Sequence, residues 1–212
     1  MTIRVAIVDD HAIIRVGFRG MLAGDSGIEV IAEGESGEQA LQIVRESAPD
    51  VLILDVSMPG ISGVEVTQRL ARNKSRTRVV IVTMHSDGPL PRLLLEAGAS
   101  GFLTKNCSEE TLRRAVRTVA AGQRFIDHDI AQRLALAATS GEQSPLDRLT
   151  ARELGVALML GRGVRSVDIA ERLHISEKTV HTYKSRIYDK LDVDTESALT
   201  LMLLRYGLLT EA

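Results

Sequence analysis

The sequence is poor in cysteine and in aromatic residues: it has one cysteine, no tryptophan, three phenylalanines and three tyrosines among 212 residues. Because Cys107 is alone, no internal disulfide can form, and the lack of Cys and His residues at metal-ligand spacing excludes a zinc finger. With aromatic residues at 3% of the chain, stacking on nucleic-acid bases is a poor mode of binding. A disulfide scaffold and a zinc-stabilised fold are therefore excluded.

Long apolar runs and an excess of one charge are absent as well. No stretch approaches the roughly 18 uninterrupted apolar residues of a membrane helix. The amino terminus, MTIRVAIVDD, lacks the basic start, apolar run and cleavage site of a secretory signal. We therefore expect a cytoplasmic protein with no membrane partner. The net charge of -2, from 26 basic and 28 acidic residues, gives no sign of a nucleic-acid partner by itself.

Short aliphatic runs alternate with amphipathic stretches up to about residue 120. The runs are IRVAIV (3–8), IEVIAEG (28–34), VLIL (51–54), VVIV (79–82) and SGFLT (100–104). Helical periodicity predicts helices at about 11–22, 36–47, 63–73, 89–97 and 108–121. Continuous apolar runs suit strands that are buried on both faces. The pattern predicts an α/β fold, doubly wound and flavodoxin-like, with a five-stranded parallel sheet.

The strand signal ends after Gly122. Residues 127–138 predict a linker helix, and TSGEQSP (139–145) is a polar break. Beyond it the periodicity is entirely helical. Helices are expected at about 150–161, 166–173, 177–191 and 195–207. The sequence predicts a first domain over residues 1–121, a linker with a helix over 122–145, and an all-α four-helix domain over 146–212.

Polar side chains follow four of the five predicted strands. They are Asp9 and Asp10 after the first strand, Asp55 after the third, Thr83 after the fourth and Lys105 after the fifth. In a doubly wound sheet these positions share one edge, where ligands bind. Three neighbouring carboxylates repel one another unless a hard cation such as Mg2+ neutralises them, and Thr83 and Lys105 can bind a phosphoryl oxygen. Any one of these residues fits a solvated strand end, but the whole set predicts a phosphoryl-handling site.

The segments VAIVDDH, LDVSMPGISG, IVT and GFLTK resemble the receiver domain of bacterial response regulators, with matching spacing along residues 1–121. The resemblance implies that Asp55 is the phosphoacceptor, that Lys105 contacts the phosphoryl group, and that Thr83 reorients on phosphorylation while Phe102 turns inward. The implied Mg2+ site consists of Asp10, Asp9 acting through metal-bound water, Asp55 and the backbone carbonyl of Ser57.

The second part contains two short helical patterns joined by a turn, in VRSVDIAERLHISEKTVHTYKSRIYDKL. Ser176 is the expected N-cap of the second helix. A helix pair of this kind suits insertion into the major groove of double-stranded DNA. Residues 145–212 hold ten basic and ten acidic residues, but residues 176–190 hold four basic and two acidic ones. The positive charge is therefore confined to one helix, although a basic helix face taken alone is usually only solvated.

Three segments, LTARELGVALML, DIAERLHISEKTVHTYKSRIYDKLDV and ALTLMLLRYGLL, resemble the NarL/FixJ (LuxR-type) effector domain along residues 148–209. The resemblance implies that His181, Thr182 and Ser185 face base edges. It implies phosphate contact or shaping of the helix for Lys178, Thr179, Tyr183, Lys184, Arg186 and Lys190. The last segment resembles the dimer helix of the family. The stretches DGPLPRLLLEAGASGFLTK and AGQRFIDHDIAQRLA are closest to the GacA/UvrY subgroup.

These features together predict a two-component response regulator that is not an enzyme beyond the phosphorylation and dephosphorylation of its own Asp55. A sensor histidine kinase or a phosphotransfer domain would supply the phosphoryl group, and a homodimer would bind promoter DNA. Two alternatives stay open. One is a phosphorylation-independent DNA-binding regulator whose receiver serves only for dimerisation. The other is an Asp-nucleophile phosphatase, which needs a second acid at the position that Ser57 occupies.

Overall fold

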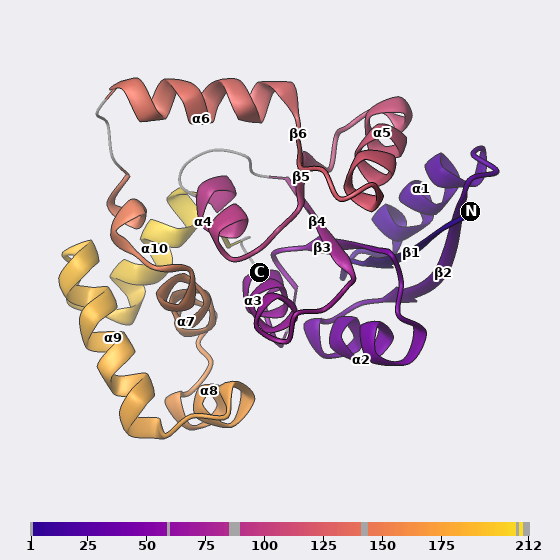
Figure 1. The fold of residues 1–212 in the computed structure, drawn as a ribbon. Helices are drawn as coiled ribbons and strands as arrows, with labels where there is room; N and C mark the ends of the chain where they lie inside the picture. Colours follow the sequence, from indigo (N-terminus) through magenta and orange to yellow (C-terminus); the bar gives the residue numbers. More distant parts are fainter. Residues whose placement is uncertain (1, 59, 85–89, 141–143, 207, 210–212) are drawn as a thin grey trace.

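The computed structural model describes residues 2–58, 60–84, 90–140, 144–206 and 208–209, in an α/β part followed by an all-helical part (Figure 1). Among these residues, six parallel strands form one sheet in the order β2-β1-β3-β4-β5-β6. The strands are β1 (Ile3–Val8), β2 (Ile28–Gly34), β3 (Val51–Asp55), β4 (Arg78–Thr83), β5 (Gly101–Thr104) and β6 (Phe125–Ile126). The chain reverses its strand order between β1 and β3, which places the expected ligand edge at their carboxyl ends.

Helices cover both faces of the sheet (Figure 1). They are α1 (Ala12–Ala23), α2 (Gly37–Ser47), α3 (Gly63–Arg72), α4 (Leu90–Glu96) and α5 (Glu109–Ala120). Alternate strand residues point to opposite faces: Val5 and Ile7 of β1 pack with α1 and α5, whereas Ala6 and Val8 pack with α2, α3 and α4. The double burial explains why each strand is a continuous apolar run, and it confirms the doubly wound fold.

The expected count of five strands is wrong by one. All five predicted strands are present, and β6 adds a sixth, pairing Phe125 with Gly101 and Ile126 with Phe102 of β5. The guanidinium of Arg114 lies 5.4 Å from the centre of the Phe125 ring. A strand of two residues is too short to produce a periodic pattern, so the sequence gives no signal for it.

The segment between the two parts contains the predicted linker helix, α6 (His128–Ser140), followed by a single 3-10 turn, η1 (Pro145–Arg148). Ser144 caps this turn, since its hydroxyl accepts a hydrogen bond from Leu146 N–H at 3.3 Å. Residues 141–143 of the predicted polar break lie outside the described residues. Because β6 belongs to the sheet, the predicted linker begins inside the α/β part.

The helices predicted after Leu149 are all present. They are α7 (Ala151–Gly161), α8 (Ser166–Leu173), α9 (Glu177–Leu191) and α10 (Glu196–Arg205). The turn between α8 and α9 begins at His174, whose φ of 51° ends α8 in the left-handed region. Ser176 then caps α9 by accepting a hydrogen bond from Thr179 N–H at 3.1 Å, as predicted. None of the helices in the described ranges has the length and apolar content of a membrane span.

Helix α7 is shared by the two parts. It packs against α3 and α4 on one side and against α8, α9 and α10 on the other. Leu154, Val156 and Leu160 are all buried, in keeping with a helix that is apolar almost all round. The apolar core on the α3 side of the sheet is therefore continuous with the core of the all-helical part.

Candidate functional site

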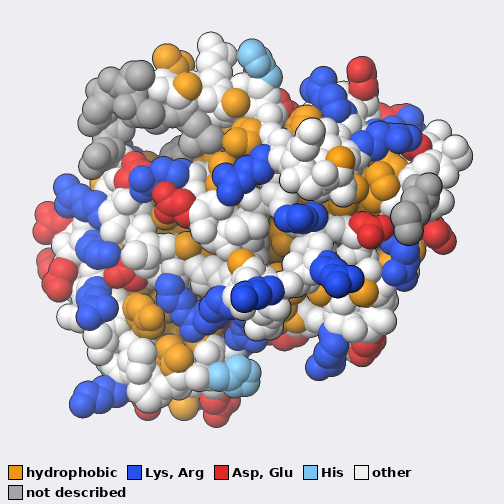
Figure 2. All heavy atoms as spheres, in the orientation of Figure 1, with side chains coloured by type: hydrophobic (Ala, Val, Ile, Leu, Met, Phe, Trp, Pro, Cys, Tyr) orange, Lys and Arg blue, Asp and Glu red, His pale blue; other side chains and the backbone are white. Residues whose placement is uncertain are grey.

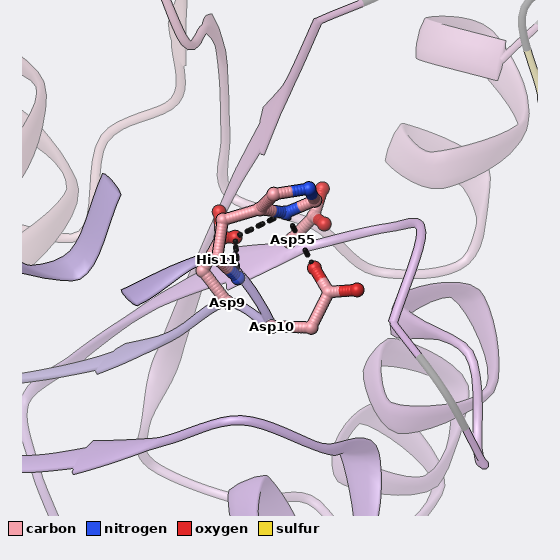
Figure 3. Close-up of side chains that lie close together, drawn as sticks. All are labelled: Asp9, Asp10, His11 and Asp55. Carbon is pink, nitrogen blue, oxygen red and sulfur yellow. Dashed lines mark hydrogen bonds and ion pairs between the residues drawn. The ribbon is translucent and has the colours of Figure 1, made fainter. Parts of the chain in front are cut away.

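Carboxylates and one ammonium group meet at the carboxyl edge of the sheet. Asp9 follows β1, Asp55 ends β3 and Lys105 follows β5, and all three are buried. Lys105 Nζ lies 2.7 Å from Asp9 Oδ2 and 3.1 Å from Asp55 Oδ2. Asp10 lies beside them and is partly exposed (Figure 3). The structure thus brings together four of the residues predicted at the strand ends.

Burial dominates the electrostatics of the pocket. It raises the pKa of Asp55, an effect that the Lys105 ammonium opposes and the Asp9 carboxylate reinforces. Burial lowers the pKa of Lys105, but Asp55 and Asp9 outweigh this and raise it above the ordinary value. The Val56 N–H also donates to Asp55 Oδ1 at 2.8 Å. Lys105 is therefore charged. Its single ammonium group balances only part of the negative charge of Asp9, Asp10 and Asp55.

The oxygen atoms of the pocket fit a hard divalent ion. One ligand atom each from Asp9, Asp10, His11 and Asp55 lies within 4.8 Å of the others. Three buried carboxylate oxygens, one each from Asp9, Asp10 and Asp55, have no described partner other than Lys105 or His11, whose nitrogen atoms lie 2.7–3.1 Å away. Buried carboxylate oxygens whose negative charge exceeds the positive charge around them favour coordination to a cation such as Mg2+. Ser57, whose carbonyl is the remaining implied ligand, lies two residues after Asp55.

His11, which directly follows the acidic pair in the sequence, also lies in this group. It is the N-cap of α1, and its side chain is 60% exposed. Its Nδ1 lies 2.8 Å from Asp10 Oδ1 and 3.3 Å from Asp9 Oδ1 (Figure 3). His11 thus adds an imidazole nitrogen to the carboxylate oxygens of the pocket.

Thr83 and Phe102 lie beside the pocket on β4 and β5. Thr83 is 3% exposed and pairs in register with Thr104, and its carbonyl accepts a hydrogen bond from Lys105 N–H at 2.9 Å. Phe102 is fully buried, so its side chain is turned inward in this structure. Thr83 thus joins the pocket residues at the sheet edge, and Phe102 lies in the core below them.

The predicted DNA-facing residues of α9 differ in exposure. His181, Thr182 and Ser185, for which base contact is implied, are all exposed. Among the remaining residues, Lys178 and Arg186 are exposed, and Thr179, Tyr183, Lys184 and Lys190 are partly buried. The structure therefore presents the three base-reading candidates on one accessible helix.

Two of the four basic side chains of α9 pair with acids of the same chain. Lys184 forms an ion pair with Glu196. Lys190 Nζ donates to Glu153 Oε2 at 2.6 Å, and Glu153 is buried in α7. Figure 2 shows Lys, Arg, Asp and Glu side chains intermingled on the face drawn, over the part where α9 lies. The Lys190 pair fits a role in shaping the helix rather than in contacting phosphate.

Comparison with known proteins matches both parts of the chain. Residues 5–117 match the response regulator receiver domain, and residues 147–203 match the LuxR family of bacterial regulatory proteins. The chain belongs to the response regulators with a LuxR-type helix-turn-helix domain. Response regulator GacA of Pseudomonas aeruginosa is 41% identical over 212 residues, which cover 99% of each chain. Response regulator UvrY of Escherichia coli K12 is 39% identical over 97% of this chain and 95% of the relative. The GacA/UvrY resemblance is thereby confirmed.

Solved response regulators share the two-domain fold. ChrA of a heme-sensing two-component system is 32% identical, with a TM-score of 0.56 over 98% of this chain and 99% of that one. RcsB of Salmonella typhimurium is 24% identical, with a TM-score of 0.76 over 97% of this chain and 98% of that one, which shows the fold alone. The chain is a response regulator with a receiver domain and a LuxR-type DNA-binding domain.

The receiver and helix-turn-helix domains of this response regulator are joined by an ionic group around Glu65 of α3, which is 1% exposed. Its Oε1 lies 2.8 Å from Arg69 Nε and 3.3 Å from Arg72 Nη2, and its other oxygen pairs with Arg152 of α7. Arg69 also donates to the Arg172 carbonyl. Sequence reasoning missed this group because Glu65 lies in an ordinary amphipathic helix and its partner Arg152 is 87 positions away.

A second contact between the domains was also missed. Arg162, the C-cap of α7, donates from Nη1 to the carbonyl of Met58 at 2.7 Å. Met58 lies in the loop that follows Asp55. Burial lowers the pKa of Arg162, while Asp55 and Asp10 act in the opposite direction. The helix-turn-helix domain thus sets a guanidinium against the loop that follows Asp55 in the receiver domain.

Proposed function

We propose that this response regulator is activated by phosphorylation of Asp55 and then binds promoter DNA in the cytoplasm as a homodimer. The observation that carries the proposal is the buried pocket in which Asp55, Asp9 and Lys105 lie within ion-pair distance, with Asp10 beside them. Positioning and charge neutralisation do most of the work in phosphoryl transfer, and this pocket supplies both.

The donor in this proposal is a phosphohistidine of a sensor histidine kinase or of a phosphotransfer domain. An oxygen of Asp55 attacks the phosphorus, the P–N bond breaks, and the imidazole leaves. Lys105 exchanges its pairing with the Asp55 carboxylate for pairing with a phosphoryl oxygen, and the Thr83 hydroxyl donates to another. Water later hydrolyses the acyl phosphate. The chain therefore turns over only its own phosphoryl group and serves no other substrate as an enzyme.

Mg2+ is the proposed cofactor of this pocket, held by Asp9 through water, by Asp10, by Asp55 and by the carbonyl of Ser57. The buried carboxylate oxygens support this assignment, because a single ammonium group and His11 balance their negative charge only in part. When bound, the ion neutralises the charge that builds up on the transferring phosphoryl group. The chain's own residues orient that group, because Lys105 fixes one side of the pocket and β3 fixes Asp55.

The DNA-binding surface in this proposal is the outer face of α9, with His181, Thr182 and Ser185 at base edges. The proposed phosphate contacts are Lys178, Thr179, Lys184 and Arg186, whereas Tyr183 and Lys190 shape the helix. The proposed domain limits are 1–121 for the receiver, 122–145 for the linker and 146–212 for the helix-turn-helix domain. Leu201 on α10 is 67% exposed, which supports α10 as the dimer helix.

Incubation of the full chain with acetyl phosphate and Mg2+ tests the proposal. Wild type should take up one phosphoryl group, measured by intact-protein mass, and should then bind promoter DNA as a dimer. Asp55→Asn should take up none, while Asp50→Asn, an exposed matched variant, should behave as wild type.

Equal labelling of Asp55→Asn and wild type would refute Asp55 as the acceptor. Promoter binding by Asp55→Asn that equals wild type, with and without the phosphodonor, would favour the phosphorylation-independent regulator instead. Sustained release of phosphate from small phosphomonoesters would favour the phosphatase.

A further inference from the structure

Arg162 of the helix-turn-helix domain contacts the loop that follows the phosphoacceptor Asp55. It stands directly after α7, where its Nη1 donates to the Met58 carbonyl at 2.7 Å, and its side chain is partly buried. The Met58 carbonyl belongs to the loop that leaves Asp55 and contains Ser57. A guanidinium keeps its charge in proteins, so a permanent cation lies beside this loop whenever the two domains are docked.

The carboxylates that act on Arg162 are those proposed to hold Mg2+. Asp55 and Asp10 both favour the charged guanidinium against the effect of its burial. Their own pocket holds more carboxylates than ammonium groups, and one buried oxygen each of Asp9, Asp10 and Asp55 has no described partner beyond its ion pair with Lys105 or His11. Two cations that share the same carboxylates repel each other. Arg162 and a bound divalent ion therefore cannot both be stabilised fully by the same charge.

Arg162 is held in its position by the docking of the helix-turn-helix domain on the receiver domain. Glu65 of the receiver domain pairs with Arg152 of α7, and Arg92 Nη2 of α4 lies 3.4 Å from Asp147 Oδ1. These contacts hold α7 against α3 and α4. If the helix-turn-helix domain leaves this surface, Arg162 leaves the pocket with it.

We propose that Arg162 is a cation that the helix-turn-helix domain supplies to the acidic pocket, so that domain docking and Mg2+ binding oppose each other. This inference rests on the proposed Mg2+ site. By linkage, the factor by which docking weakens Mg2+ binding equals the factor by which Mg2+ weakens docking. Because the proposed phosphoryl transfer needs Mg2+, Mg2+ replaces Arg162 before phosphorylation. This exchange weakens the docking of the two domains before any phosphoryl group is present.

The test compares Mg2+ affinities of full-length variants by isothermal titration calorimetry at low ionic strength. Arg162→Gln keeps an N–H donor but removes the charge, and it should bind Mg2+ about three- to tenfold more tightly than wild type. Arg165→Gln is the matched control: it removes the same charge from an exposed side chain that pairs with Asp168 within its own domain. Its Mg2+ affinity should equal that of wild type.

A second variant separates the effect of docking from the effect of the Arg162 side chain. Arg152→Gln keeps Arg162 but breaks the ion pair with Glu65. It should weaken docking and so also tighten Mg2+ binding. The double variant Arg152→Gln/Arg162→Gln should gain less than the product of the two single effects, because undocking already removes the cation. Small-angle X-ray scattering should show that Mg2+ expands wild type more than it expands Arg162→Gln. Circular dichroism checks that each variant is folded.

Wild-type affinity in both Arg162→Gln and Arg152→Gln overturns the inference, and so does an equal gain in Arg165→Gln. A failure of the proposed function looks different, since wild type and every variant would then bind no Mg2+. An affinity that rises in Arg162→Gln but falls in Arg152→Gln also overturns the inference, because the effect would then not depend on docking.

Discussion

Removal of the charge on Glu65 should destabilise the whole chain. The side chain is 2% exposed, and its carboxylate is shared by Arg69 and Arg152, whose side chains are 17% and 18% exposed. Arg72, at 60% exposure, adds little because solvent screens it. In Glu65→Gln the two mostly buried guanidinium groups lose their counter-charge, whereas the carboxamide oxygen still accepts a hydrogen bond.

The expected cost follows from the burial of these partners. Removal of one partner of a buried ion pair costs about 3–5 kcal/mol. Because the arginines keep some contact with water and one hydrogen bond survives, we expect a loss of about 2–3 kcal/mol in the free energy of unfolding. For a chain of this length, each kcal/mol corresponds to about 2–4 °C in Tm.

Thermal and urea unfolding followed by far-UV circular dichroism measures this loss. Glu46→Gln is the matched control, since the Glu46 side chain is 57% exposed and its nearest cation, Arg45 Nη2, is 4.0 Å away. It should change the free energy of unfolding by no more than about 0.5 kcal/mol. If Glu65→Gln is as stable as Glu46→Gln, the ionic group around Glu65 does not hold the domains together and the reasoning is wrong.

Two further predictions concern Cys107 and α9. Burial, together with the Asp127 carboxylate, raises the pKa of the Cys107 thiol to about 11, so at pH 8 its thiolate fraction should be about a hundredfold below that of a thiol with the ordinary pKa. Alkylation by iodoacetamide should be slow at pH 8 and accelerate up to about pH 11, and fast labelling at pH 8 would contradict the burial. Arg186→Ala should weaken DNA binding for all sequences and reduce the salt slope by about one unit. Lys184→Ala should reduce it by less, because Glu196 already neutralises that lysine; equal slopes would argue against this pairing.

The sequence predicted the sheet and its pocket because both have local signals. VLIL is a strand buried on both faces, and Asp55 follows it directly, so the topology alone brings that carboxylate to the common edge. The separation of Arg162 from Met58 and of Arg152 from Glu65 is 104 and 87 positions. Contacts of this kind depend on how two folded domains pack against each other. The hydrophobic pattern within either domain therefore does not predict them.

The short strand β6 fixes the point at which the chain leaves the sheet. Phe125 and Ile126 are hydrogen-bonded into the sheet. The chain beyond them therefore starts from a fixed point on the receiver domain and not from an unstructured linker. Helix α6 follows at once and spans 13 residues, which corresponds to a rod of about 20 Å. An undocked helix-turn-helix domain would therefore stay connected to the sheet edge through α6. In the proposed homodimer, the length of this helix would limit how far apart the two helix-turn-helix domains can lie.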